Sequence, residues 1–450
     1  MINNWFLNKF NMLFIRINRV FLPLLFAAFL QCSSRSDEMP SMGDNTEVPD
    51  EIDFNTDGIS YSWDTHTWKG LDDSLTYGIK KDGNLDAVRI VQGNRTSYSV
   101  DKEYYRVRIP VAEVTKSGTI IVVSEGRLGD NPAVPPGTDR DWDHVLISRS
   151  TDFGETWDTK VIYDGDNNTD FGAIAIVADK KHDGRIQILG THQNGMLIMQ
   201  SFDDGITWSE HHQSGPVIYS SESVNVRMRP NNGIQIMGEN LYNGDFILGG
   251  ITGYNTKTRM VILHYDFATD TWLEHDIMNV EQRPDIPEEI TLIELESDSR
   301  NKIRIITRPS KEVSFKQQLV YDLDDNSHEG LGWANSRFPY VRCNQNARRY
   351  SSEYGNQTSR LIYSSTKNVG NNRFGGNISI SYDEGGSWLT KQLVDDTVYF
   401  GYSQVLTLPD GSLGCIYEGT NSSGFNNSAL MFRRFTLGWL TDGADFGFKN

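Results

Sequence analysis

Aspartate recurs at a fixed place in three short segments, where a regularly spaced carboxylate could serve acid–base chemistry. The shared pattern is S-x-D-x-G-x-[T/S]-W, and the three segments are Ser150–Trp157, Ser201–Trp208 and Ser381–Trp388. The same spacing suits a hairpin turn, because an Asp side chain can accept hydrogen bonds from backbone N–H groups and Gly tolerates a positive φ. The Trp would then re-enter a strand and pack beneath its own turn. We therefore interpret these carboxylates as turn residues and not as catalytic groups.

The cysteines and histidines give no pattern typical of metal chemistry. The chain has three cysteines, Cys32, Cys343 and Cys415, and neither a CxxC nor an HExxH spacing. Metal sites built from Cys and His commonly show such spacings, so the sequence predicts no metal site and no cofactor. Cys343 and Cys415 could pair in an oxidising compartment, but two cysteines do not make a disulfide scaffold.

The elements that must carry the three turns also repeat. Weaker copies of the turn at Tyr265–Trp272 and Asp322–Trp333 bring the tryptophan interval to between 51 and 64 residues. Propeller blades of four short strands recur at about this period or slightly less. Strand-like stretches fill the gaps, namely Thr119–Val123, Arg185–Leu189, Phe246–Gly250, Lys302–Ile306, Arg360–Tyr363 and Ser412–Ile416.

The repeat predicts an all-β fold, a six-bladed β-propeller. Five units run from about Arg106 to Trp388, and a sixth follows from Phe400 to about Phe435. We expect strand material between Gly58 and Val100 to complete the sixth unit and close the ring. The alternative for residues 57–95 is a small separate β segment. No long amphipathic helix is apparent.

The N-terminus is typical of a targeting segment. Lys9, Arg16 and Arg19 precede the apolar run Val20–Leu30, which is too short to span a bilayer comfortably. Cys32 follows, and then a polar stretch. This pattern resembles a bacterial lipoprotein signal, although Gln31 stands where a small residue is usual. The resemblance implies lipidation of Cys32 and a place in the bacterial cell envelope, at the surface or in the periplasm. Simple secretion and a retained signal anchor are the alternatives.

These observations divide the chain into three expected parts. They are a signal peptide over 1–31, a polar tether over 32–56 and the propeller over 57–450. The formal net charge is −18, and an acidic surface repels phosphate backbones, which argues against nucleic acid as a partner. An anionic substrate would need a local basic site.

Motifs outside the repeat are more specific than the turns. Arg108-Ile-Pro110 is similar to the Arg-Ile-Pro signature that opens a sialidase domain. Together with the repeated turn, known as the Asp-box or BNR repeat, it resembles the bacterial exo-α-sialidase (neuraminidase) family. The resemblance continues in order to about Trp439, through Val122–Arg127, Arg229–Ile236, Glu289–Leu295, Ile303–Arg308, Arg373–Ser381, Gly401–Ser403 and Leu408–Glu418. One departure is the stretch Phe171–Ile176, which lacks the family's Asp-Pro pair and leaves the contacts to one face of the substrate open.

The resemblance implies a role for each of seven side chains. The substrate carboxylate would be held by three arginines, Arg108, Arg308 and Arg373. Tyr402 would be the nucleophile with Glu289 as its base, Asp139 the acid/base, and Arg127 a neighbour of the sugar's O4 side. Asp141 and Asp143 are close rivals of Asp139, and Glu288 is a rival of Glu289.

This set of residue types suits sialic acid chemistry. Paired guanidinium groups bind carboxylates, and a neutral phenol avoids the repulsion that an anionic nucleophile meets at a carbon bearing a carboxylate. A phenol needs a base beside it, because its own pKa is near 10. The implied activity is release of terminal α-linked sialic acid from glycoproteins, glycolipids or oligosaccharides, with retention of configuration. The alternatives are an inactive sialic-acid-binding propeller and a propeller glycosidase acting on another acidic glycan.

Overall fold

The computed structural model describes most of the chain after residue 50, in stretches separated by gaps. The described residues are 51–53, 60–63, 66–69, 87–92, 96–97, 103–139, 141–164, 171–192, 195–211, 226–238, 241–252, 259–278, 287–296, 301–309, 314–329, 334–353, 357–368, 370–420 and 429–445. The predicted signal peptide, Cys32 and most of the predicted tether lie outside these residues.

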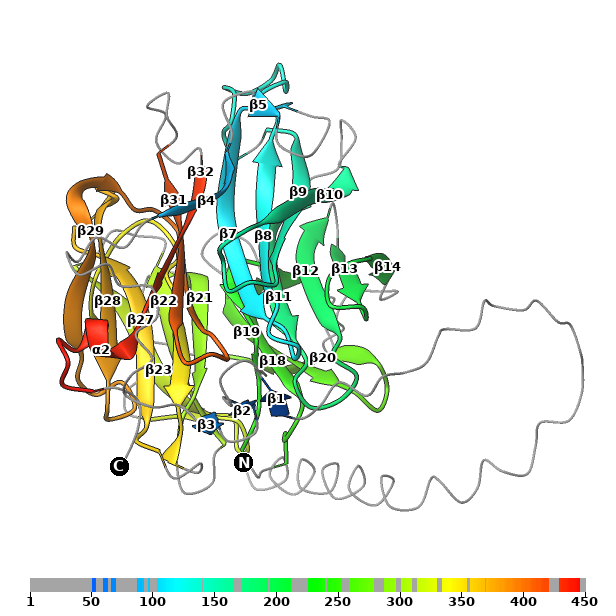
Figure 1. Cartoon of the computed structure of the whole chain (residues 1–450). Coiled ribbons are helices and arrows are strands. Elements are labelled where there is room, and N and C mark those ends of the chain that lie inside the picture. Colours follow the sequence, from blue (N-terminus) through cyan, green and yellow to red (C-terminus); the bar gives the residue numbers. More distant parts are fainter. Residues whose placement is uncertain are drawn as a thin grey trace, which may run out of the picture. The chain divides into compact units, whose positions relative to one another are not determined.

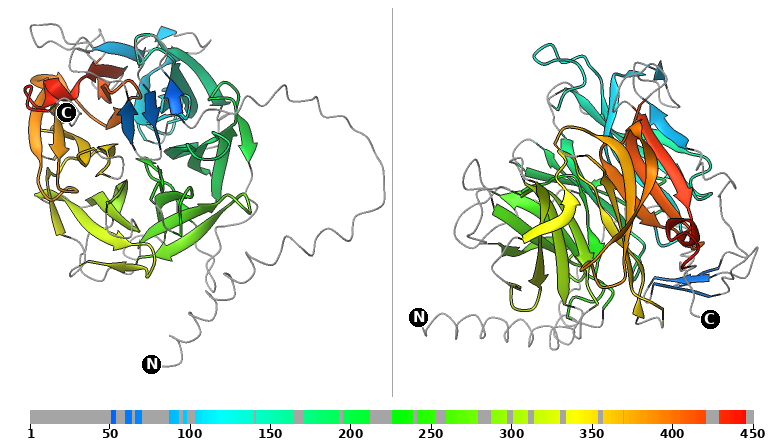
Figure 2. Two further views of the ribbon diagram at one scale, coloured as in Figure 1. Left: turned by 60° about the horizontal axis from the view of Figure 1, so that its bottom comes forward. Right: turned by 90° about the vertical axis from the view of Figure 1, so that its left-hand side faces the viewer.

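Six antiparallel sheets stand around one axis, as the left view of Figure 2 shows, which confirms the predicted all-β, six-bladed propeller. In blades 1, 2, 5 and 6 the first strand lies at the axis and the further strands of the sheet pair in order. Blade 4 begins in the same way, but its last strand, Ala334–Pro339, pairs with Phe315–Asp322 and not with the strand before it. The strands of the first five blades (Figure 1) are β7 (Arg106–Val114), β8 (Ile120–Arg127), β9 (Asp143–Ser150) and β10 (Asp158–Asp164) in blade 1; β11 (Phe171–Ala178), β12 (Ile186–His192), β13 (Gly195–Ser201) and β14 (Ser209–His211) in blade 2; β15 (Val226–Arg227), β17 (Ile234–Gln235), β18 (Phe246–Thr252), β19 (Arg259–Asp266) and β20 (Thr271–Ile277) in blade 3; β21 (Pro287–Glu294), β22 (Lys302–Pro309), β23 (Phe315–Asp322), β24 (Ser327–His328) and β25 (Ala334–Pro339) in blade 4; and β26 (Ala347–Ser351), β27 (Arg360–Thr366), β28 (Phe374–Ser381) and β29 (Leu389–Tyr399) in blade 5.

The sixth blade joins the two ends of the propeller. It consists of β30 (Ser403–Thr407), β31 (Leu413–Gly419), β32 (Ala429–Phe435) and β4 (Val88–Gln92), and β4 pairs antiparallel with β32. A strand that precedes blade 1 in the chain therefore closes the ring. A two-residue pair, β5 (Thr96–Ser97) and β6 (Glu103–Tyr104), follows β4. Between blades 2 and 3, β16 (Asn231–Asn232) runs parallel to β11.

A separate three-stranded sheet precedes β4. It consists of β1 (Glu51–Asp53), β2 (Ser60–Ser62) and β3 (Thr67–Lys69). The region before blade 1 thus contains both a ring-closing strand and a small separate sheet. Because β1 falls within 32–56, folded structure begins inside the stretch that the sequence predicted as tether.

The three repeated turns form as their residues predict. In the first, Asp152 Oδ1 accepts a hydrogen bond of 2.9 Å from the Thr156 N–H, and Trp157 Nε1 donates to the Gly154 carbonyl at 3.0 Å. Gly154 has φ of 90°, and its Cβ-less backbone lies against Phe432. The equivalent bonds recur at Asp203 and Asp383. These carboxylates are occupied by their own turns, which agrees with a structural role.

Apolar side chains fill the spaces between neighbouring blades. The cluster between blades 1 and 2 includes Val111 and Ile121 from one blade and Ile174 and Ile176 from the other, all at most 1% exposed. Such packing fixes each blade against the next, so the starts of the inner strands meet in a defined arrangement. Among the described residues the single helix is α2 (Leu437–Leu440), and no helix there is long and apolar enough to cross a membrane.

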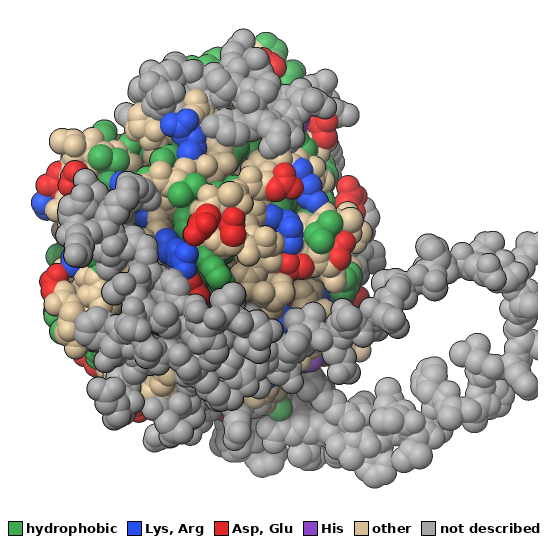
Figure 3. All heavy atoms as spheres, viewed as in Figure 1, with side chains coloured by type: hydrophobic (Ala, Val, Ile, Leu, Met, Phe, Trp, Pro, Cys, Tyr) green, Lys and Arg blue, Asp and Glu red, His purple; other side chains and the backbone are tan. Residues whose placement is uncertain are grey.

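Two further observations concern the cysteines and the surface. Cys343 and Cys415 are buried free thiols and do not pair with each other. On the face seen in Figure 3, acidic and basic side chains are interspersed over the described surface. The excess of carboxylates is thus not gathered into one acidic patch there.

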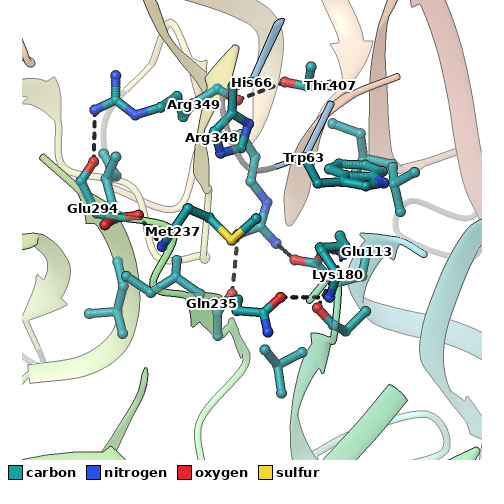
Figure 4. Close-up of a pocket in the computed structure, with 18 of the residues that line it drawn as sticks. Trp63, His66, Glu113, Lys180, Gln235, Met237, Glu294, Arg348, Arg349 and Thr407 are labelled. Atoms are coloured by element: carbon teal, nitrogen blue, oxygen red, sulfur yellow. Dashed lines mark hydrogen bonds and ion pairs between the residues drawn. The ribbon is translucent and has the colours of Figure 1, made fainter. Parts of the chain in front are cut away.

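A cavity of about 110 Å³ lies at the ends of the inner strands, on the side of the small sheet (Figure 4). Glu113 lines it five residues beyond Arg108 on β7, and Thr407 lines it five residues beyond Tyr402 at β30. At about 3.3 Å per strand residue, the cavity is about 16 Å from the predicted catalytic residues. Trp63 of the small sheet borders it. The cavity therefore belongs to the other end of the axis.

Inside this cavity Glu113 links two cations. Lys180 Nζ lies 3.3 Å from one carboxylate oxygen, and Arg348 pairs with the other, as Figure 4 shows. All three side chains are at most 14% exposed. We expect Glu113→Gln to lower the free energy of unfolding by about 3 kcal/mol, because it leaves two buried cations without their counter-charge. Urea denaturation would measure this loss.

The matched control is Glu329→Gln at the exposed Lys302–Glu329 pair, whose charged atoms lie 2.7 Å apart. Exposed ion pairs contribute about 1 kcal/mol or less to stability. The free energy of unfolding of this variant should therefore be close to that of the wild-type protein. Equal losses in the two variants would contradict the assigned role of Glu113.

Candidate active site

A phenol and a carboxylate from opposite parts of the chain meet at the axis. Tyr402 stands immediately before β30 and Glu289 lies on β21, and the Tyr402 hydroxyl donates a hydrogen bond to Glu289 Oε1. The two residues are 6% and 4% exposed. The side chains that the sequence predicted as nucleophile and base are therefore in direct contact.

A β-bulge places two carboxylates around Arg308. Pro287 pairs with Pro309 and Glu289 with Arg308, so Glu288 is the extra residue in β21. Glu288 forms an ion pair with Arg308 Nη2, whereas Glu289 Oε2 lies 3.0 Å from Arg308 Nε without hydrogen-bond alignment. The Tyr402 hydroxyl bonds Glu289 and not Glu288. The geometry thus favours Glu289 over its rival as the base.

Three guanidinium groups converge on this pair. The guanidinium carbons of Arg108 and Arg373 lie 5.7 and 5.3 Å from the centroid of the Tyr402 ring. Arg308 Nε lies 3.0 Å from Glu289 Oε2, so it is beside the carboxylate that the Tyr402 hydroxyl contacts. Arg108 comes from β7, Arg308 from β22, and Arg373 immediately precedes β28. The three arginines predicted to bind a carboxylate therefore surround the phenol.

Glu418 on β31 holds these arginines, and the sequence prediction gave it no role. Its carboxylate is 0% exposed, accepts from Arg108 Nε at 2.6 Å and lies 3.8 Å from Arg373 Nη1. It also accepts from the Ile109 N–H at 2.9 Å. Ile109 has φ of 55°, an uncommon conformation for a β-branched residue, in an irregular stretch of β7. With the chain in this conformation, Arg108 Nε and the Ile109 N–H both donate to Glu418 Oε1.

Asp139 and Arg127 form the side of the site that comes from blade 1. Arg127, at the end of β8, is 1% exposed and donates from Nη1 to Asp139 Oδ1 at 2.8 Å. Glu125 receives two further bonds from the same guanidinium. The Asp139 side chain is 84% exposed and lies 4.0 Å from Arg108 Nη1. Asp139 can therefore reach a ligand held by Arg108.

The two rival aspartates are used differently. Asp141 is 1% exposed and accepts from the backbone N–H groups of the loop and of Trp142, so it fixes the loop. The Asp143 side chain is 11% exposed and lies 4.0 Å from Arg127 Nε. Of the three, Asp139 is the one with an open side chain, and the geometry favours it as the acid/base.

The surroundings set the protonation of the two key groups in opposite directions. Burial and the Glu289 carboxylate raise the pKa of Tyr402 well above the usual tyrosine range, although Arg308, Arg373 and Arg108 oppose this. Desolvation would raise the pKa of Asp139, but Arg127 and Arg108 hold it below its ordinary value. In the empty site the phenol is therefore protonated and Asp139 is ionised at neutral pH.

This arrangement can bind an anion and move protons. Three arginines offer hydrogen-bond donors to a carboxylate, and a phenol lies beside a base. A second carboxylate, Asp139, lies 4.0 Å from Arg108 Nη1, so it can contact a ligand that Arg108 binds. Among the described residues no cluster of three or more His, Cys, Asp or Glu side chains could hold a metal ion. The groups at hand are those of acid–base and nucleophilic chemistry.

Comparisons with known proteins give a fold and no family. No family model and no curated protein sequence matches the chain. Among solved structures, it is similar to the Hadza microbial sialidase Hz136 (18% identity, 75% of this chain and 67% of that one, TM-score 0.59). It is also similar to a mutant of the NanB sialidase of Streptococcus pneumoniae (13%, 83% and 73%, TM-score 0.60) and to the intramolecular trans-sialidase of Ruminococcus gnavus in complex with oseltamivir carboxylate (13%, 81% and 99%, TM-score 0.57). The chain shares the propeller fold of these proteins.

Proposed function

We propose that this protein is an exo-α-sialidase, a glycoside hydrolase that releases terminal α-linked sialic acid with retention of configuration. One observation carries the proposal: the Tyr402 hydroxyl is bonded to the Glu289 carboxylate inside a ring of three arginines. A phenol beside a base is a nucleophile, and the arginines supply the counter-charge for a substrate carboxylate. The propeller shared with known sialidases supports the same conclusion.

The first chemical step uses both carboxylates. Glu289 takes the phenolic proton as the Tyr402 oxygen attacks the anomeric carbon, and the bond to the leaving oxygen breaks. Protonated Asp139 gives its proton to that oxygen. In the second step Asp139 takes a proton from water, whose oxygen displaces Tyr402, and the phenol regains its proton from Glu289. Two displacements at one carbon give net retention.

Asp139 must change its protonation state between the empty and the loaded site. Arg127 and Arg108 keep the pKa of Asp139 low in the empty site, against the effect of desolvation. A bound substrate carboxylate would offset the charge of Arg108 and Arg373, and the sugar would exclude water from the exposed side chain. Both effects raise the pKa of a carboxyl group. We therefore assign the role of acid to Asp139 in the complex.

A sialic-acid-binding propeller without activity is the second candidate from the sequence. It needs the arginines, but it has no use for the contact between Tyr402 and Glu289. A glycosidase for another acidic glycan is the third, because three arginines specify a carboxylate and do not name the sugar.

Incubation with sialyllactose separates these functions. We expect free sialic acid and lactose to appear in the proton NMR spectrum, catalysed by the wild-type protein. Binding without turnover would favour the inactive propeller, and neither binding nor turnover would favour another acidic glycan. An anhydro sugar as the first product would show that the enzyme transfers the sialyl group intramolecularly, through the same nucleophile, and does not hydrolyse the substrate.

We also propose that Cys32 carries a lipid and tethers the enzyme to the bacterial cell envelope. This proposal depends on the N-terminal pattern alone, since Cys32 lies outside the described residues. A tethered enzyme would act on sialylated glycans that reach the cell surface or periplasm.

A further inference from the structure

A buried lysine lies beside the proposed nucleophile and base. Lys316 on β23 is 1% exposed. Thr307 pairs with Gln317 across β22 and β23, so the same register brings Lys316 next to Arg308, which in turn pairs with Glu289 on β21. Side chains that face each other across antiparallel strands lie on the same face of the sheet. Glu289 and Arg308 thus pair directly, and the charges of both act on Lys316.

The ammonium of Lys316 bonds a segment that touches the rest of the site. Lys316 Nζ donates to the Cys343 carbonyl at 2.9 Å. The Cys343 side chain packs in one cluster with Tyr402. In the same segment, Val341–Gln345, the Arg342 carbonyl accepts from Arg373 Nη2 and the Asn344 carbonyl accepts from the Ser403 N–H. Lys316 thus fixes the segment Val341–Gln345. This segment contacts both Arg373 of the arginine triad and the start of β30, next to Tyr402.

A lysine is a costly choice for this place. A buried ammonium loses its hydration, and within the described part of the chain the Cys343 carbonyl is its one hydrogen-bond acceptor. A methionine of similar length would fill the space without that cost. A charge placed near Glu289 in spite of this cost points to a use of the charge.

We propose that Lys316 is a positioning residue for the Tyr402–Glu289 pair: its ammonium fixes the segment Val341–Gln345 and supports Glu289 as an ionised base. This inference rests on the proposed function and deepens it. When Lys316 loses its proton, its charge-assisted hydrogen bond to the Cys343 carbonyl weakens, the segment is fixed less firmly and the first chemical step slows.

The charged neighbours of Lys316 influence the pH at which Lys316 loses its proton. Burial lowers the pKa of Lys316 to about 8; Cys343 and Glu289 oppose this change, and Arg308 and Arg373 add to it. Burial raises the pKa of the Cys343 thiol to about 11, and the pKa of Tyr402 lies well above the usual tyrosine range. Of these three groups with shifted pKa values, Lys316 is the one that titrates near pH 8.

The test is the pH dependence of kcat with an aryl sialoside, whose good leaving group needs little help from Asp139. We expect wild-type kcat to fall above about pH 8. Lys316→Arg keeps its charge throughout this range, so the fall should disappear. Lys316→Met should lower kcat by about 10- to 100-fold, the range seen when groups that orient a site are removed, with a smaller rise in KM because Arg373 also bonds the segment that Lys316 fixes.

Three results would overturn the inference: an alkaline fall that persists in Lys316→Arg, a Lys316→Met variant with wild-type kcat, or a change in KM alone. A wild-type protein that turns over no sialoside at any pH would instead refute the proposed function. A crystal structure of Lys316→Met then gives a readout without substrate. A displaced Val341–Gln345 segment with a broken Tyr402–Glu289 contact supports the positioning role, and an unchanged geometry refutes it.

Discussion

Tyr402→Phe should lose turnover of every sialoside, by about 10⁴-fold or more in kcat, the scale on which loss of a catalytic nucleophile acts. The substitution removes one oxygen and leaves a ring of the same shape. Arg108, Arg308 and Arg373 stay in place, so affinity for a sialic acid ligand should change little. Steady-state kinetics with sialyllactose and with an aryl sialoside, together with calorimetric binding of sialic acid, measure both quantities.

Tyr399→Phe is the matched control. Tyr399 is another buried phenol of the same region, but its hydroxyl contacts Arg373 Nη1 at 3.4 Å and not Glu289. Loss of that single bond to a charged guanidinium should cost about 10- to 150-fold at most, in line with about 1.5–3 kcal/mol for a hydrogen bond to a charged group, and so far less than the loss in Tyr402→Phe. Wild-type rates in Tyr402→Phe on both substrates would contradict the mechanism.

Asp139→Ala should have the second largest effect, and the effect should depend on the leaving group. Sialyllactose has a poor leaving group, so its cleavage should drop by about 10²- to 10⁴-fold, the usual contribution of general acid catalysis. The aryl group of an aryl sialoside leaves with little protonation. The rate of the first step with this substrate should therefore fall less. Rates on the two substrates, compared for each variant, measure the difference.

Asp141→Ala and Asp143→Ala serve as controls for this assignment. Asp141 accepts backbone N–H groups within its loop, so its loss should lower both rates in proportion or destabilise the loop. Asp143 lies beside the buried Arg127 and should likewise show no dependence on the leaving group. A leaving-group dependence at either position, and its absence at Asp139, would reassign the acid.

The fold could be predicted from the sequence because its repeat carries local physical signals. The turn at Asp152 forms through bonds within eight residues, and the predicted strand Lys302–Ile306 lies inside β22. Closure of the ring was harder. β4 pairs with β32 more than 300 residues later, and its short run has no copy of the repeated turn beside it. The strand β1 was missed because three residues in a polar stretch carry no periodicity.

The candidate site could be proposed from the sequence where a residue's type and order resemble a known family, and less so where a role depends on contacts. The choice between Asp139 and Asp141 depends on which side chain the loop's own N–H groups occupy. Glu418 and Lys316 act through partners far away in the chain, Arg108 and the Cys343 carbonyl. No local spacing marks such a residue, because the propeller brings the partners together only after folding.

The most direct measurement is the configuration of the sialic acid first released from sialyllactose, followed by proton NMR before mutarotation mixes the anomers. Attack by Tyr402 followed by attack of water predicts that the α-anomer appears first and the β-anomer grows in later. Release of the β-anomer first would mean that water attacks directly, and it would contradict the role of Tyr402 as nucleophile.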